Sequence, residues 1–155
     1  MTAYTKMHFD FDQIAGLVSP RQQLDLAAVG IGIIRLPAGQ GYTFTHSHKE
    51  QEEVYVVMGG SGVILIDGAL IPLQRGDVVR TAPEARRALR AADHEPLLVL
   101  CAGAVAAGYP KDPNARFLID DGIPDYDDIP PWYAGNPEVK RRNEELKARM
   151  RRPKP

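Results

Sequence analysis

The stretch HSHKEQEEVYVVMGG, residues 46–60, decides both the fold and the chemistry expected of this chain. His46 and His48 stand two residues apart, and side chains alternate between the faces of a β-strand, so both imidazoles project to the same side. The polar run KEQE then predicts a turn, and the run EVYVVM that follows is strongly β-forming. We therefore expect the chain to fold back and bring Glu53 beside the two histidines.

Two imidazoles and one carboxylate on a shared face form a facial ligand set. Such a set suits a divalent transition metal, namely Fe, Mn, Zn or Ni, and leaves coordination positions open for chemistry. Glu50 and Glu52 are competing carboxylates, ranked lower because charged turn residues usually point into water. In the alternative without a metal, His46 and His48 line a barrel and bond to neighbouring hydroxyls or carboxylates.

This stretch resembles the first motif of the cupin family, G-x5-H-x-H-x3,4-E-x6-G. His46, His48, Glu53 and Gly60 fall on its two histidines, its glutamate and its last glycine, while Gln40 stands at its first glycine. The resemblance implies an all-β chain folded as a double-stranded β-helix, or jelly-roll barrel, that binds a small molecule. It also implies a homodimer, which many cupins form.

The second cupin motif, G-x5-P-x-G-x2-H-x3-N, is matched only in part. Gly76 stands at its glycine, but Arg87 stands where metal-binding cupins carry a histidine as the fourth ligand. A guanidinium cannot ligate a metal, and at about 5 Å it opposes a divalent ion by roughly 6 kcal/mol at an effective dielectric near 20. Either Arg87 turns away, or it points inward, pairs with Glu53 and offers a cation to anionic ligands. His94 is a weaker substitute ligand, because a histidine in a polar turn is more often solvated.

Composition describes one ordinary globular domain. The chain has 155 residues, a hydrophobic content of 44%, a charged content of 25% and a net charge of -1, which steers it neither to nucleic acid nor to a membrane. Cys101 is the only cysteine, so no internal disulfide forms and a cytoplasmic location is expected. No segment has the pattern of a signal peptide or of a membrane span.

Residues 1–107 are expected to form the barrel, beginning with an N-terminal strand. Residues 7–12 alternate polar and apolar side chains, and residues 24–36 are rich in β-branched residues and glycine, so each predicts a strand. An Asp67–Gly68 pair predicts a two-residue hairpin turn. Beyond the histidines, further short strands are expected at about residues 62–66, 69–73, 77–81, 86–91 and 96–103.

Residues 108–135 form a segment rich in proline and aspartate, with several aromatic residues interleaved. Disordered linkers rarely carry so many aromatics, so we expect an extended arm that packs on a barrel, its own or a partner's. A calcium loop is the alternative for the aspartates, but their spacing lacks the alternating ligands and closing glutamate. Surface charge is the favoured interpretation of this cluster, which comprises Asp120, Asp121, Asp125, Asp127 and Asp128.

Residues 136–155 predict a basic C-terminal helix. Asn136 is a good N-cap, Pro137 suits the first turn, and Glu138 complements the positive end of the helix dipole. The segment carries eight Lys or Arg against three Glu, but no nucleic-acid-binding motif accompanies it, so a solvated terminus is favoured.

Three functions remain open. The first is a metal-dependent cupin enzyme of the dioxygenase or isomerase type acting on a small oxygenated molecule, with Tyr55 as a proton donor or as a packing residue. The second is a non-catalytic binding or sensory module without metal, in which Arg87 binds an anionic ligand. The third is a structural dimer whose arm and helix recruit a partner.

Overall fold

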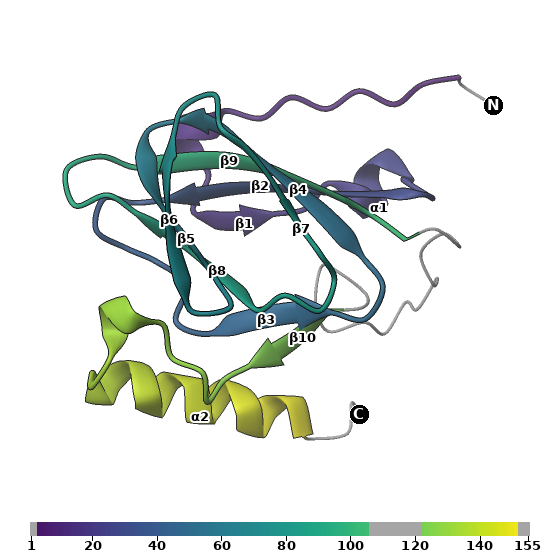
Figure 1. Cartoon of the computed structure of the whole chain (residues 1–155). Coiled ribbons are helices and arrows are strands. Elements are labelled where there is room, and N and C mark those ends of the chain that lie inside the picture. Colours follow the sequence, from purple (N-terminus) through teal and green to yellow (C-terminus); the bar gives the residue numbers. More distant parts are fainter. Residues whose placement is uncertain (1–2, 106–121, 152–155) are drawn as a thin grey trace.

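The computed structural model describes residues 3–105 and 122–151, which form two five-stranded antiparallel sheets packed face to face (Figure 1). One sheet has the order β1-β2-β9-β4-β7 and the other the order β10-β3-β8-β5-β6. The strands are β1 (Gly16–Val18), β2 (Val29–Leu36), β3 (Thr45–His48), β4 (Glu52–Gly59), β5 (Ser61–Ile66), β6 (Ala69–Gln74), β7 (Val78–Thr81), β8 (Arg87–Ala91), β9 (Leu97–Ala104) and β10 (Gly122–Asp125). The helical elements are η1 (Phe11–Gln13), α1 (Arg21–Leu24), η2 (Pro131–Tyr133) and α2 (Pro137–Arg151).

The inward faces of the two sheets form one apolar core, because alternate residues of each strand point between the sheets. On β4, Tyr55 and Val57 are buried, and on β9, Leu97 and Val99 are buried. The strands predicted after the histidines are present within one or two residues of the expected positions.

Two turns show why particular residues are required. Asp67 and Gly68 both have positive φ, 46° and 86°, as the two-residue turn of the β5–β6 hairpin demands. Gly60 has φ 72°, and a Cβ there would lie 1.8 Å from the carbonyl oxygen of Pro96. Only glycine fits at Gly60, which explains this position of the first motif.

Two predictions near the N-terminus were wrong. Residues 7–12 do not form a strand, because Asp10 accepts a hydrogen bond from the backbone of Asp12 and caps the short 3-10 helix η1. The strand expected over residues 24–36 begins only at Val29, because α1 ends at Leu24 and Asp25 takes the left-handed conformation, φ 53°. The N-terminal strand of the barrel is instead β1, which pairs with β2.

The described part of the C-terminal arm packs on the chain's own barrel. Strand β10 pairs with β3 along its whole length, and α2 lies beneath this pair (Figure 1). Asn136 caps α2 as predicted, accepting from the backbone of Glu138 and Val139. Residues 108–121 of the arm, with Asp120 and Asp121, lie outside the described residues. In the part of the chain that the structure describes, no helix combines the length and apolar character that a membrane span requires.

Candidate metal centre

Strands β3 and β4 bring His46, His48 and Glu53 together at one end of the barrel interior. The Nε2 atom of His48 lies 3.1 Å from Oε1 of Glu53, and Nε2 of His46 lies 4.0 Å from Oε2. One ligand atom from each residue lies within 4.8 Å of the other two. The three side chains therefore converge as the alternation of the strand and the following turn predict.

The Glu53 carboxylate is held from several sides at an exposure of only 1%. Its Oε1 accepts a hydrogen bond from Nε2 of Gln51 at 2.7 Å, and its Oε2 accepts one from the Tyr55 hydroxyl at 2.6 Å. Burial disfavours the charged carboxylate, but contacts with His48, Arg87 and Tyr55 outweigh it and hold the pKa of Glu53 well below its usual range. Glu53 is therefore an ionised carboxylate with a fixed orientation.

Arg87 points inward and pairs with Glu53. It lies opposite His46 in the pairing of β3 with β8, and its Nη2 and Nε donate to Oε2 of Glu53 at 2.8 and 3.2 Å. Its Nη1 donates to the carbonyl oxygens of Pro83 and Ala85 at 2.9 and 2.7 Å. With 1% exposure and its donors engaged, Arg87 is a fixed internal cation.

His46 is a neutral imidazole in this environment. Burial and the positive charge of Arg87 lower the pKa of His46 to about 3, and Glu53 offsets only part of this effect. A neutral imidazole keeps a nitrogen lone pair available, which a metal ligand requires.

The comparisons with known proteins agree with this geometry. A family model described as a cupin domain matches residues 32–103. The crystal structure of a cupin protein from Bacteroides fragilis is 39% identical to this chain, and the match covers 72% of this chain and 92% of that one, with a TM-score of 0.64. The chain belongs to the cupin family.

Two further relatives are similar to this cupin. An RmlC-like cupin protein from Desulfovibrio desulfuricans is 26% identical, with 65% of this chain and 97% of that chain covered and a TM-score of 0.51. An uncharacterized protein of Methanocaldococcus jannaschii is 27% identical over 59 residues, which are 38% of this chain and 47% of that protein. The cupin matches about half the length of this curated relative. The two sheets of the present chain form the double-stranded β-helix that the family resemblance implies.

The donor set of this cupin fits a divalent ion in spite of Arg87. Metal bonds of about 2.0–2.2 Å place neighbouring ligand atoms roughly 3–3.5 Å apart. The 3.1 Å between His48 and Glu53 lies in that interval, and the 4.0 Å between His46 and Glu53 lies somewhat above it. Arg87 at about 5 Å opposes the ion by roughly 6 kcal/mol, whereas a carboxylate at about 2 Å attracts it at least twice as strongly. The site is therefore attractive to a metal overall, but less so than one with a neutral fourth ligand.

The other candidate ligands of the sequence lie elsewhere. The His94 side chain is 77% exposed and lies 3.4 Å from Glu95. Glu52 pairs with Arg80 at the surface, and Glu50 is exposed. None of these three residues joins the site.

Sequence reasoning missed Gln51, the side chain that orients Glu53 together with Tyr55. Gln51 is buried, although it belongs to the polar run that predicted a turn. A Cβ at Gly103 would lie 2.5 Å from its Nε2, so the glycine on β9 leaves room for this amide. The pairing of Gly103 with Glu53 across β9 and β4 is a long-range contact without a local sequence signal.

His46, His48 and Glu53 lie on the wall of a cavity of about 590 Å³, and Tyr55 lines the same cavity. Leu17, Ile34, Leu36 and Phe44 supply much of its apolar wall. Arg87 is not among the described residues that line it, because it lies behind Glu53. Because Arg87 does not line the cavity, its position disfavours the alternative in which Arg87 binds an anionic ligand.

Proposed function

We propose that this cupin binds a divalent transition metal, Fe, Mn, Zn or Ni, through His46, His48 and Glu53 and acts on a small oxygenated molecule in the barrel cavity. The observation that carries the proposal is the convergence of three donor atoms within 4.8 Å on the wall of a cavity large enough for a small molecule. When bound, such an ion polarises a substrate oxygen or activates dioxygen, which corresponds to isomerase or dioxygenase chemistry.

The residues around the ligands have defined roles in this proposal. Arg87, Tyr55 and Gln51 orient the Glu53 carboxylate, as outer partners of metal ligands do in other proteins. Burial raises the pKa of Tyr55 well above its ordinary value, so the hydroxyl keeps its proton and donates it to Glu53 in a hydrogen bond. Tyr55 is therefore a positioning residue rather than an acid that releases its proton.

Cobalt substitution tests both the ligands and the open coordination positions. We expect Co²⁺ added to the metal-free protein to give visible absorption bands, and azide to shift them by occupying an open position. His46→Ala should abolish the bands, whereas His94→Ala, which removes an exposed histidine outside the site, should leave them unchanged. Bands that persist in His46→Ala, or bands that azide does not change, would contradict a three-ligand open site.

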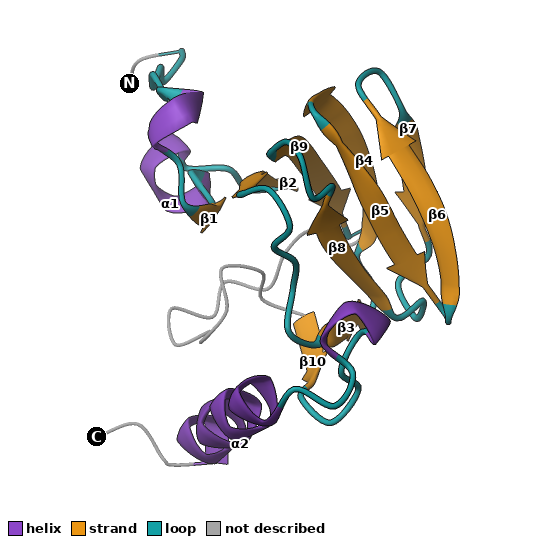
Figure 2. Ribbon diagram, turned by 90° about the vertical axis from the view of Figure 1, so that its left-hand side faces the viewer, coloured by secondary structure: helices purple, strands orange, loops and turns teal. Residues whose placement is uncertain are grey.

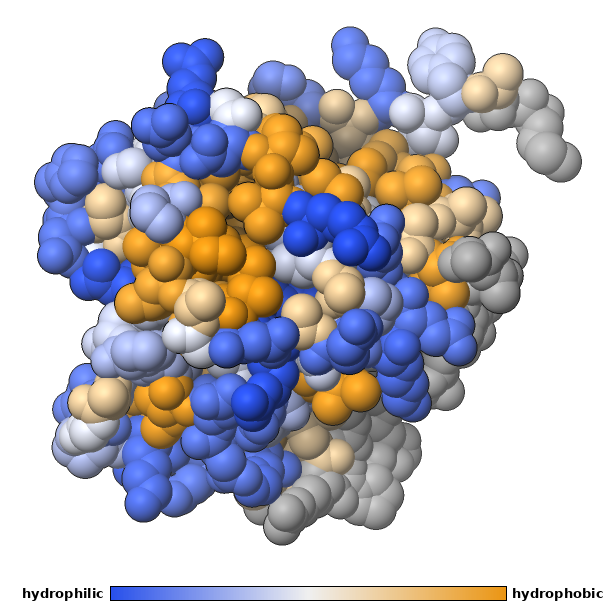
Figure 3. All heavy atoms as spheres, viewed as in Figure 1, coloured by the Kyte–Doolittle hydropathy of each residue, from blue (hydrophilic) through white to orange (hydrophobic). Residues whose placement is uncertain are grey.

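We also propose a homodimer, in which a second copy covers apolar residues on the outer side of the barrel. Val78 and Met58 are 65% and 37% exposed, and apolar side chains gather over the barrel while α2 is mostly hydrophilic (Figure 3). The cytoplasmic location expected from the single cysteine stays a prediction.

A further inference from the structure

We propose that Arg142 of α2 recognises the anionic group of a small amphiphilic ligand, a carboxylate or sulfonate, whose apolar body occupies the barrel cavity. This inference names the class of ligand for the proposed function, and it rests on the part of that function that places a small molecule in the cavity. It does not rest on the metal.

Helix α2 and the segment before it are held against the wall of the cavity. Asn143 is buried, and its Nδ2 donates to the carbonyl oxygens of Thr43 and Tyr126 at 2.7 and 3.1 Å. In addition, Nε1 of Trp132 donates to the carbonyl oxygen of Tyr42 at 3.1 Å. Thr43 and Tyr42 themselves line the cavity, so the C-terminal segment holds part of its wall.

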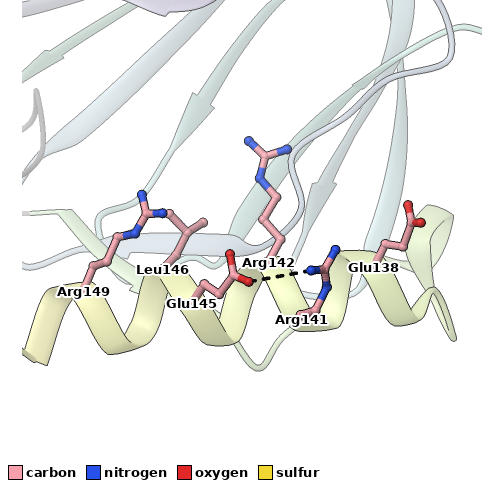
Figure 4. A pocket seen from close by; sticks show the side chains of 6 residues that line it. All are labelled: Glu138, Arg141, Arg142, Glu145, Leu146 and Arg149. Atoms are coloured by element: carbon pink, nitrogen blue, oxygen red, sulfur yellow. Dashed lines mark ion pairs between the residues drawn. The ribbon is translucent and has the colours of Figure 1, made fainter.

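Arg142, the residue just before Asn143, points toward the barrel. Figure 4, which draws a groove along α2 and not the barrel cavity, shows the Arg142 guanidinium rising from the helix toward the barrel, whereas Arg141 lies along the helix and pairs with Glu145 at 4.0 Å. Arg142 is one of the residues that line the cavity. Figure 2 shows α1 and α2 on the same side of the sheets, and Arg21 of α1 also lines the cavity.

The described lining of the cavity carries more positive than negative side chains. Glu53 is the only carboxylate among the described lining residues, and Arg87 already neutralises it. Two guanidinium groups, Arg21 and Arg142, line the same cavity. No carboxylate of the described residues pairs with Arg142, although its neighbours Arg141 and Lys147 each have an acidic partner.

These features together select an anion with an apolar body. An apolar wall favours hydrocarbon by roughly 25 cal/mol per Å² buried, and a guanidinium binds carboxylate or sulfonate oxygens through paired hydrogen bonds. A neutral ligand would form no charge pair with Arg142, and a cationic ligand would be repelled by its guanidinium. Arg142 lies outside the residues matched by the family model, so this specificity belongs to the C-terminal helix and not to the cupin motifs.

The experiment compares two fluorescent probes with the same aromatic body. 8-Anilinonaphthalene-1-sulfonate carries a sulfonate, and N-phenyl-1-naphthylamine lacks it; both are titrated into the protein in the presence of chelator, so that no metal contributes. We expect Arg142→Gln to raise the Kd of the anionic probe about fivefold to tenfold and to leave the Kd of the neutral probe unchanged. Arg142→Lys should recover part of the loss, and Arg141→Gln should change neither Kd.

Thr43→Trp, which adds bulk to the cavity wall, should weaken both probes and so confirm that they bind in the cavity. Equal weakening of both probes in Arg142→Gln would overturn the inference, because it would assign Arg142 a structural role. An unchanged Kd for the anionic probe would overturn it as well. If neither probe binds the native protein, the inference fails, because the cavity then does not accept an anion with an apolar body, whereas the cobalt experiment judges the metal site of the proposed function separately.

Discussion

Arg87 stands where the family motif has its fourth metal ligand, and it changes the electrostatic environment of His46, His48 and Glu53. Its guanidinium is buried against Glu53 and three backbone carbonyl oxygens. Breaking such a buried pair by removing one partner typically costs about 3–5 kcal/mol of stability. Removal of the Arg87 side chain alone is therefore expected to destabilise the metal-free barrel, because it leaves the Glu53 charge buried without its partner. The Arg87 charge also lowers the attraction of the site for a cation.

Substituting Arg87 tests this double role. Arg87→His removes the internal cation and restores a fourth ligand, so we expect Zn²⁺ affinity to rise at least tenfold in a chelator-competition titration. The metal-free variant should be less stable than the native protein, and zinc should reverse that loss. Arg87→Met removes the charge without adding a ligand, so the difference in zinc affinity between the two variants measures the contribution of the added histidine ligand. Unchanged zinc affinity in Arg87→His would contradict the position assigned to Arg87.

The lowered pKa of His46 predicts acid destabilisation of the metal-free protein. The unfolded chain takes up a proton at His46 near pH 6.5, whereas the folded chain does so only near pH 3. Stability is therefore complete above about pH 6.5 and falls as the pH drops toward 3, by at most about 1.4 kcal/mol per pH unit for one proton. Glu53 adds a further loss only below its ordinary pKa, near 4.5.

Urea denaturation between pH 7 and 4.5 measures the loss of stability in the interval where His46, and not Glu53, takes up a proton on unfolding. We expect the free energy of unfolding to decline over this interval in the native protein and to stay nearly constant in His46→Gln. The same slope in both proteins would show that His46 is not held as a neutral imidazole in the folded chain.

The inward direction of His46, His48 and Glu53 was predictable, since strand alternation and the length of the KEQE turn fix it locally. The direction of Arg87 was not, because it depends on the pairing of β3 with β8 and on carbonyl oxygens that only the folded chain brings near. The role of Gln51 depends likewise on Gly103, fifty-two residues further along.

Strands with strong β-forming runs and clear turns were predictable, and the N-terminal elements were not. Asp67–Gly68 and the run after Glu53 carry their signals within a few residues. Residues 7–12 alternate polar and apolar side chains, but a strand also needs a neighbouring strand with free backbone groups. Asp10 instead accepts a hydrogen bond from the backbone of Asp12 and so stabilises the short 3-10 helix η1. The start of α2 was predictable because its N-cap signals are local.

Asn143 joins α2 to the barrel and gives the sharpest test of this contact. Asn143→Ala leaves the carbonyl oxygens of Thr43 and Tyr126 without this donor, so we expect a loss of about 2–3 kcal/mol in the free energy of unfolding. Asn136→Ala, which removes only the exposed helix cap, should cost about 1 kcal/mol. Equal losses in the two variants would mean that Asn143 does not anchor the helix.

The molecule as a whole combines a cupin barrel with a C-terminal helix that contributes Arg142 to the barrel's cavity. The proposed homodimer adds a second copy on the apolar outer side. We expect light scattering to give twice the chain mass of 17.1 kDa, and Val78→Glu to shift the protein to the monomer, because a charge in an apolar contact is costly to bury. Lys147→Glu, on α2, should leave the mass unchanged, and a native monomer would contradict the proposal.

The most direct test of the metal centre is the metal content of the purified, untagged protein, measured by inductively coupled plasma mass spectrometry after chelation and reconstitution with Fe, Mn, Zn or Ni. We predict close to one ion per chain for the preferred metal, with loss of that ion in His46→Ala and retention in His94→Ala. A native protein that holds no ion after reconstitution, or an ion that survives in His46→Ala, would contradict the assignment of His46, His48 and Glu53 as the metal ligands.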